Sequence, residues 1–207
     1  MSTTQQEIAT PDSVITKNVR HRKFIKGSTR WLTYTALFSA LAIVMKIVGQ
    51  YLTLTPSFKI TLIYTVWLIA GAVLGAVGGG AVCFISDVLG AFIVPMGAIN
   101  PLTIVANTLF GVIAALVFRF TPSKHYTVKF IASGIACTVL CTCLLGSLAL
   151  WYGYKYYETL TLWQYFIGKR LTQVAVAVIN IPITLAMIPL LKRLNVLPEL
   201  KSRKRST

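Results

Sequence analysis

The sequence has few charged residues and almost no acidic ones. Charged side chains make up 12% of the 207 residues, and Asp and Glu together number 5. An ordinary soluble domain devotes about a quarter of its residues to charge. Because the mean hydropathy is also +0.72, this scarcity excludes a water-soluble globular domain and predicts a protein that is solvated by lipid.

Catalytic, nucleotide-binding and metal-binding motifs are missing too. No GxxxxGK[ST] loop is present, so the chain lacks the usual cradle for ATP phosphates. His21 and His125 fall in basic segments, and neither an HExxH motif nor a serine with a histidine base supports a membrane hydrolase. The 4 cysteines lie in apolar stretches without metal-binding spacing. We therefore predict a protein that is not an enzyme and carries no cofactor or metal.

The first thirty residues lack the apolar core of a signal peptide and end in a basic run. We predict a basic cytoplasmic tail at 1–30, a transmembrane domain at 31–191 and a second basic tail at 192–207. The net charge of +15 comes from Lys and Arg in these tails and in one loop, beside apolar runs. That placement is typical of membrane topology, and we do not expect nucleic-acid binding.

Six apolar runs predict an all-α integral membrane protein with six transmembrane helices. Punctuating residues separate the runs, including the glycines 78–80 between the second and the third. The runs cover 31–51, 60–77, 81–94, 101–120, 128–151 and 165–191.

Basic residues set the expected orientation. If the amino terminus is inside, the two tails and the loop after the fourth helix hold 15 of the 20 Lys and Arg residues. Basic residues flanking membrane helices favour the cytoplasmic side. We therefore predict that both termini are cytoplasmic and that three loops lie outside.

Two charged residues lie inside the predicted spans. Lys46 is deep in the first helix, and Asp87 is the only acidic residue in any span. Such groups usually face a protein interior or an aqueous cavity. Lys46 is expected to face an anion or to extend to the outer interface. Asp87 is expected to pair with Lys46, to accept hydrogen bonds from a polar ligand, or to do both.

Other candidate ligand-binding residues lie towards the outer side. Lys169 and Gln173 recur with Asn180 on one stripe of the last helix, and Arg170 borders it. Polar residues on one helix face either bond a neighbouring helix or line a cavity. The remaining candidates are a cation, an amide and three aromatic side chains: Lys59, Asn107, Tyr64, Trp67 and Tyr152.

Small residues recur at spacings of four. Gly71 and Gly75 form a GxxxG motif in the second helix, and Ala36 and Ala40 form a similar pair in the first. These spacings let helix backbones approach closely. Tight packing inside the bundle is the ordinary expectation for such a motif.

Over nearly all of 31–191 the chain resembles the substrate-binding S components of energy-coupling factor (ECF) vitamin transporters. The shared marks are six helices in about 180 residues, cytoplasmic ends, and the pair Ala36 and Ala40. The resemblance implies that these alanines dock on a transmembrane coupling subunit, which works with two ATPase subunits. It also implies a multi-pass protein of the bacterial cell membrane, in contact with membrane lipid.

The stretch from the second to the fourth helix is most similar to folate-specific S components. It contains an Asp-x-x-Gly, a Pro-x-Gly and a Leu-x-Gly element, beginning at Asp87, Pro95 and Leu109. Lys46 stands where those proteins often have Arg, which keeps the charge but loses bidentate geometry. The resemblance implies capture of folate from outside. Another vitamin (pantothenate or a pterin-like compound) and an ion-coupled secondary carrier stay open as alternatives.

Overall fold

The computed structural model describes most of the predicted transmembrane domain. The described residues are 28–55, 58–59, 61–93, 100–123, 125–153, 155, 158, 161–165, 167, 171–194 and 196–197. Both predicted tails lie almost wholly outside them. The elements, in chain order, are α2 (Thr29–Tyr51), β1 (Thr53–Thr55), β2 (Phe58–Lys59), α3 (Ile63–Ile93), α4 (Pro101–Phe120), α5 (Tyr126–Cys137), the π-helix η2 (Thr138–Leu145), α6 (Gly146–Gly153), α7 (Leu162–Tyr165) and α8 (Leu171–Arg193).

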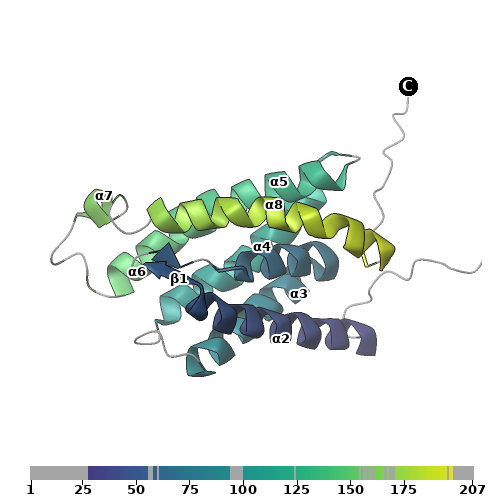
Figure 1. The fold of residues 1–207 in the computed structure, drawn as a ribbon, viewed down its shortest axis with the longest axis horizontal. Helices are drawn as coiled ribbons and strands as arrows, with labels where there is room; N and C mark the ends of the chain where they lie inside the picture. Colours follow the sequence, from purple (N-terminus) through teal and green to yellow (C-terminus); the bar gives the residue numbers. More distant parts are fainter. Residues whose placement is uncertain are drawn as a thin grey trace, which may run out of the picture.

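The long helices form one elongated bundle (Figure 1). The start of α2 and the end of α8 lie at one end, called the terminal end below. The opposite end, called the far end, carries β1, α6 and α7. Apart from the short antiparallel pair of β1 and β2, the described structure is helical, which confirms the predicted all-helical class.

Within the described part of the chain, five helical segments are long and apolar enough to cross a membrane: Thr29–Tyr51, Ile63–Ile93, Pro101–Phe120, Tyr126–Gly153 and Val174–Arg193. The second and third predicted runs together form the single element α3. Its 31 residues are interrupted at Gly75, which has φ 77° and ψ −175°. Only glycine adopts this region without strain.

The break in α3 therefore falls at Gly75, and the prediction that it falls at 78–80 is wrong. Gly79 is helical and serves close packing instead: a Cβ placed there would lie 2.8 Å from Cα of Gly71 and 2.8 Å from the carbonyl oxygen of Gly111. Residues eight positions apart in a straight helix are separated by about 12 Å. The contact of Gly71 with Gly79 shows that the two halves of α3 fold back on each other.

Gly71 and Gly75 thus have different roles, although they form one motif. A Cβ at Gly71 would lie 3.0 Å from Cβ of Ala114 in α4, whereas a Cβ at Gly75 would meet nothing within 4 Å. Close packing is therefore confirmed for Gly71. Gly75 supplies the turn.

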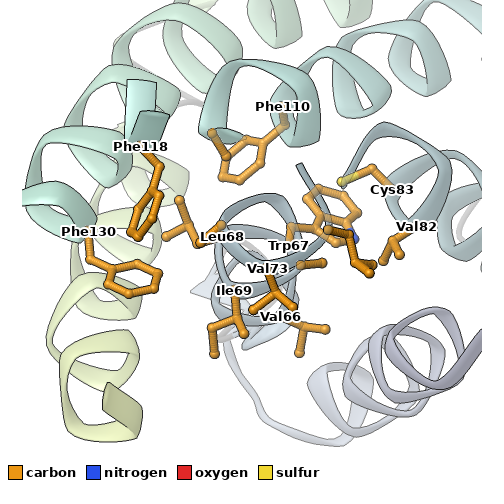
Figure 2. Packing of buried hydrophobic residues seen from close by; sticks show 14 of the residues in the cluster. Val66, Trp67, Leu68, Ile69, Val73, Val82, Cys83, Phe110, Phe118 and Phe130 are labelled. Atoms are coloured by element: carbon orange, nitrogen blue, oxygen red, sulfur yellow. The ribbon is translucent and has the colours of Figure 1, made fainter. Parts of the chain in front are cut away.

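The core lies where α3 packs against α4 and α5. In its centre Trp67 and Leu68 project from α3 in different directions (Figure 2), and the ring of Phe110 in α4 packs against that of Trp67. Each of these three residues is at most 3% exposed. The rings of Phe118 and Phe130 pack at its edge with a tilt of 59° and with centroids 4.9 Å apart. Burial of such aromatic side chains, each with 150–250 Å² of surface, holds α3 in the middle of the bundle.

The fifth apolar run forms one continuous helical segment from α5 through η2 to α6. The π-helical turns of η2 contain more residues per turn than an α-helix. They therefore change which side chains of α6 face a given direction. At the far end, the side chain of Asn100 caps α4 and donates a 2.9 Å hydrogen bond to the carbonyl oxygen of Ala149 in α6. These contacts fix α6 beside the start of α4.

Candidate functional site

Three polar side chains meet inside the apolar helices. The ammonium of Lys46 in α2 lies 2.9 Å from Oδ1 of Asp87 in α3 and donates a second hydrogen bond, of 3.2 Å, to the carbonyl oxygen of Asp87. Asn107 in α4 donates a 2.9 Å hydrogen bond from Nδ2 to the other carboxylate oxygen of Asp87. We call these residues the polar cluster. It joins three helices within two turns of the far end.

A glycine makes room for this cluster. A Cβ at Gly90 would lie 2.6 Å from Cδ and 3.1 Å from Nζ of Lys46. The Lys46 and Asp87 side chains are only 16% and 13% exposed. Isolated charges in such surroundings cost several kcal/mol, so each is held there by the other.

The pairing bears on the two sequence predictions for these residues. Asp87 is paired with Lys46, which was one of the two expectations for it. Because Asp87 compensates its charge, Lys46 is not a free cation for a ligand carboxylate in this arrangement. Oδ1 of Asn107 and one N–H of Lys46 have no hydrogen-bond partner among the described residues.

Two of the predicted aromatic residues lie in the core. Trp67 is 2% exposed, and its indole donates a 3.0 Å hydrogen bond to the hydroxyl of Ser86. Tyr64 is half-buried and packs edge-on against Trp67, with ring centroids 5.7 Å apart. Both rings also contact Phe110, at 5.4 and 5.5 Å between centroids. The structure thus groups them with the packing between α3 and α4.

The predicted stripe of α8 is described only at Asn180. This residue is fully buried and donates from Nδ2 to the carbonyl oxygens of Thr61 and Val176, at 2.8 Å each. Its Oδ1 accepts a 2.9 Å hydrogen bond from Thr65. Asn180 therefore bonds a neighbouring helix. Lys169, Arg170 and the side chains of Gln173 and Lys59 lie outside the described residues.

A shallow apolar cavity of about 360 Å³, wide open to the outside of the bundle, lies between α4 and the segment formed by η2 and α6, at the far end. Val105 and Tyr152 in its lining are 58% and 65% exposed. Tyr152 and Trp151 contribute its aromatic side chains. The other lining residues are Leu102, Val105, Ala106, Leu109, Leu145, Leu148 and Ala149. Its size falls within the range of roughly 300–1,000 Å³ that is usual for small-molecule sites.

Sequence reasoning found only Tyr152 among these lining residues. The missed signal is a pair of matching apolar stripes. Positions 102, 105, 106 and 109 and positions 145, 148, 149 and 152 share the helical spacing of three, four and seven. Asn107 lies about 200° round α4 from both 105 and 109, at about 100° per residue, so the cavity and the polar cluster occupy different faces of α4.

The alanine pair lies on the surface of α2. Ala36 and Ala40 are both exposed, together with Leu37 and Leu41 beside them. Among the described helices, α2 packs chiefly against α3. The alanines therefore present a flat apolar face away from the bundle.

Comparison with known proteins identifies the family of this chain. The family model described as "ECF transporter, substrate-specific component" matches residues 30–191. A solved structure, the S component of a bacterial ECF transporter, is similar over 80% of this chain and 95% of its own, at 22% identity and a TM-score of 0.54. No curated protein sequence matches the chain. The structural likeness confirms the predicted S-component-like fold.

Proposed function

Because this chain belongs to the family of substrate-specific components of ECF transporters, we propose that it captures folate at the far end of the bundle and passes it to an ATP-driven coupling module. Members of this family are substrate-binding subunits of membrane transporters rather than enzymes. Folate as the cargo, and the residues that bind it, are what we propose beyond the family role.

The observation that carries the proposal is the apolar cavity between α4 and α6. A pterin ring is flat and aromatic, and such ligands bind in concave apolar sites with aromatic walls and a few polar groups. Tyr152 and Trp151 supply aromatic walls for the ring. Each ring face that stacks on an aromatic side chain adds roughly 0.5–1.5 kcal/mol beyond the burial of apolar area.

Folate also carries carboxylates, which require cations. Lys46 is a poor candidate because Asp87 already pairs with it at 2.9 Å. Lys59, Lys169 and Arg170 belong to the sequence segments that precede α3 and α8. We assign the carboxylates to these three residues from the sequence, with Gln173 as a further hydrogen-bonding group.

A second mode of binding uses the polar cluster directly. The amide-like edge of a pterin carries both donors and acceptors. Oδ1 of Asn107 would accept from a ring N–H, and the remaining N–H of Lys46 would donate to a ring carbonyl. The two available groups in the cluster favour this mode, whereas the volume and the aromatic walls favour the cavity.

The proposed topology has six crossings, with both termini in the cytoplasm. The folding back of α3 at Gly75 supports it, because each half then runs in the opposite direction. The half at 63–74 contains 12 residues and spans about 18 Å, whereas a hydrocarbon core is roughly 30 Å thick. This half would therefore be a short crossing. The distribution of basic residues supports a cytoplasmic location for the terminal end.

Docking on the coupling subunit is assigned to Ala36 and Ala40. Their exposure on α2 supports this role, since a partner helix could approach closely there. The coupling subunit and two ATPase subunits would then supply the energy for transport. In this proposal the chain itself hydrolyses no ATP.

Titration calorimetry on the purified protein in detergent tests the proposal. We expect tight folate binding without ATP, and weak or no binding of pantothenate. Preference for pantothenate or another vitamin would leave the family role intact but reject folate. Folate uptake by vesicles that contain this chain alone, driven by a proton or sodium gradient, would instead establish the ion-coupled carrier.

A further inference from the structure

Four basic side chains gather at the terminal end of α4, α5 and α8. Arg119 ends α4, Lys129 follows the first turn of α5, and Lys192 and Arg193 end α8. Arg119, Lys192 and Arg193 are exposed, and Lys129 is half-buried. We call these four residues the basic cluster.

Two of the ammonium groups lie against aromatic rings of neighbouring helices. Nζ of Lys129 lies 5.4 Å from the ring centroid of Phe118 and donates a 3.3 Å hydrogen bond to the carbonyl oxygen of the same residue. Nζ of Lys192 lies 5.4 Å from the ring centroid of Tyr126. Tyr126 and Lys129 are three positions apart and therefore neighbours on the surface of α5. These partners are neutral, so they do not compensate the charge of either ammonium group.

No acidic side chain of the described chain compensates this charge. The described acidic residues are Asp87, which pairs with Lys46 near the far end, and Glu158, which lies between α6 and α7. The first turn of α5 has no acidic residue and no side-chain cap. The C-termini of α4 and α8 carry partial negative charge, which the basic residues in their last turns offset. Among the described residues, an anion at this end of the bundle would therefore find basic side chains and no acidic one.

The surroundings of the basic cluster are apolar and exposed. Phe120 is 75% exposed and Val128 47%. Leu190 in α8 and Leu194 just beyond its end are 48% and 61% exposed. In a membrane protein, such residues contact acyl chains, and basic side chains beside them reach the headgroup region. A ligand for this place therefore combines a negative charge with a hydrocarbon part.

We propose that the basic cluster binds the phosphate of an anionic phospholipid, with the acyl chains lying against the apolar residues around it. The site needs only that these helices cross a membrane. Its assignment to the cytoplasmic leaflet rests on the proposed orientation. Binding there would hold the ends of α4, α5 and α8 at headgroup depth.

Native mass spectrometry of the full chain, released from nanodiscs of equal parts phosphatidylglycerol and phosphatidylcholine, tests the proposal. We expect the wild type to retain phosphatidylglycerol. The triple variant Arg119→Gln/Lys192→Gln/Arg193→Gln should retain at least about tenfold less, because each basic residue near an anionic surface contributes substantially to attraction. Lys129 stays unchanged in this variant, since it packs on Phe118.

Two single variants serve as controls. Arg30→Gln removes an exposed charge on α2, which packs chiefly on α3, and Lys155→Gln removes an exposed charge beyond α6. Both should retain phosphatidylglycerol as the wild type does. Thermal melting in pure phosphatidylcholine shows whether the triple variant is folded. If it is not, Arg119→Gln and Arg193→Gln are measured singly and should each reduce retention.

Four results would overturn the proposal. The first is equal retention by the triple variant and the wild type, and the second is an equal loss in Arg30→Gln, which would indicate non-specific attraction. The third is displacement of the lipid by millimolar inorganic phosphate, which would indicate a site for free phosphate. The fourth is a triple variant that retains the lipid as the wild type does but no longer assembles with the coupling subunit, which would make this surface a protein interface.

Discussion

The indole of Trp67 donates a 3.0 Å hydrogen bond to the hydroxyl of Ser86, across the fold at Gly75. Both groups are buried, and the two residues are nineteen positions apart in one helical element. The bond therefore links the two halves of α3 directly. Buried polar groups of this kind cost about 1–3 kcal/mol when one partner is removed.

Any residue other than glycine should be strained in the turn at Gly75. Gly75→Ala meets no steric obstacle, since nothing lies within 4 Å, but it forces alanine into φ 77°. We expect a loss of roughly 1–3 kcal/mol, measured as a lower melting temperature in detergent. Val77→Ala, at a 54% exposed position two residues later, should change the melting temperature much less. Equal melting temperatures for Gly75→Ala and the wild type would contradict the strained turn.

Filling the apolar cavity should abolish folate binding without unfolding the protein. Val105→Trp projects an indole into the cavity from α4, and we expect at least a tenfold rise in the dissociation constant. Leu116→Trp is the matched control, because it lies on the same helix, is 40% exposed and does not line the cavity. If both variants bind folate as the wild type does, the ligand does not occupy the cavity.

The polar cluster should be tested by neutralising one charge and then both. Asp87→Asn leaves Lys46 buried without its counter-charge and should destabilise the fold by about 3–5 kcal/mol. The double variant Lys46→Met/Asp87→Asn should recover most of that loss, since no charge then remains.

Calorimetry on the same double variant separates the two binding modes. Near-normal folate affinity would assign the polar cluster to joining α2, α3 and α4. A stable double variant that no longer binds folate would favour direct ligand contact by Lys46 and Asn107.

The exposed face formed by Ala36 and Ala40 should control assembly with the coupling subunit but not the binding of folate. Ala36→Leu/Ala40→Leu places bulky side chains on an exposed face of α2 and should prevent co-purification with the coupling subunit. Folate affinity should stay within about twofold, because α2 does not line the cavity. Parallel loss of assembly and affinity would mean that these alanines support the fold.

Much of the fold follows from the sequence because lipid imposes long apolar helices. The run at 101–120 matches α4, and the run at 31–51 matches α2 within two residues. The break in α3 was predicted at the wrong glycines because the sequence alone does not distinguish a glycine that turns the chain from one that packs closely. Which of them turns and which packs is decided by tertiary contacts, such as that of Gly79 with Gly111.

The site was only partly predictable for a related reason. Lys46 and Asp87 are isolated charges in apolar helices, and neither is stable there alone. Their presence therefore predicts an ion pair between them. Apolar stripes on two helices look alike whether they face lipid, a core or a cavity. The π-helix η2 also shifts the helical phase before Leu148 and Tyr152, and the sequence gives no sign of that shift.

The peripheral position of α2 has a consequence for how such a protein can change over time. The helix that carries Ala36 and Ala40 contributes no residue to the walls of the cavity. If the cavity holds the cargo and Ala36 and Ala40 dock as we propose, substitutions that alter cargo preference and substitutions that alter docking would therefore accumulate independently. The docking face that we propose could in this way stay unchanged while the walls of the cavity diverge.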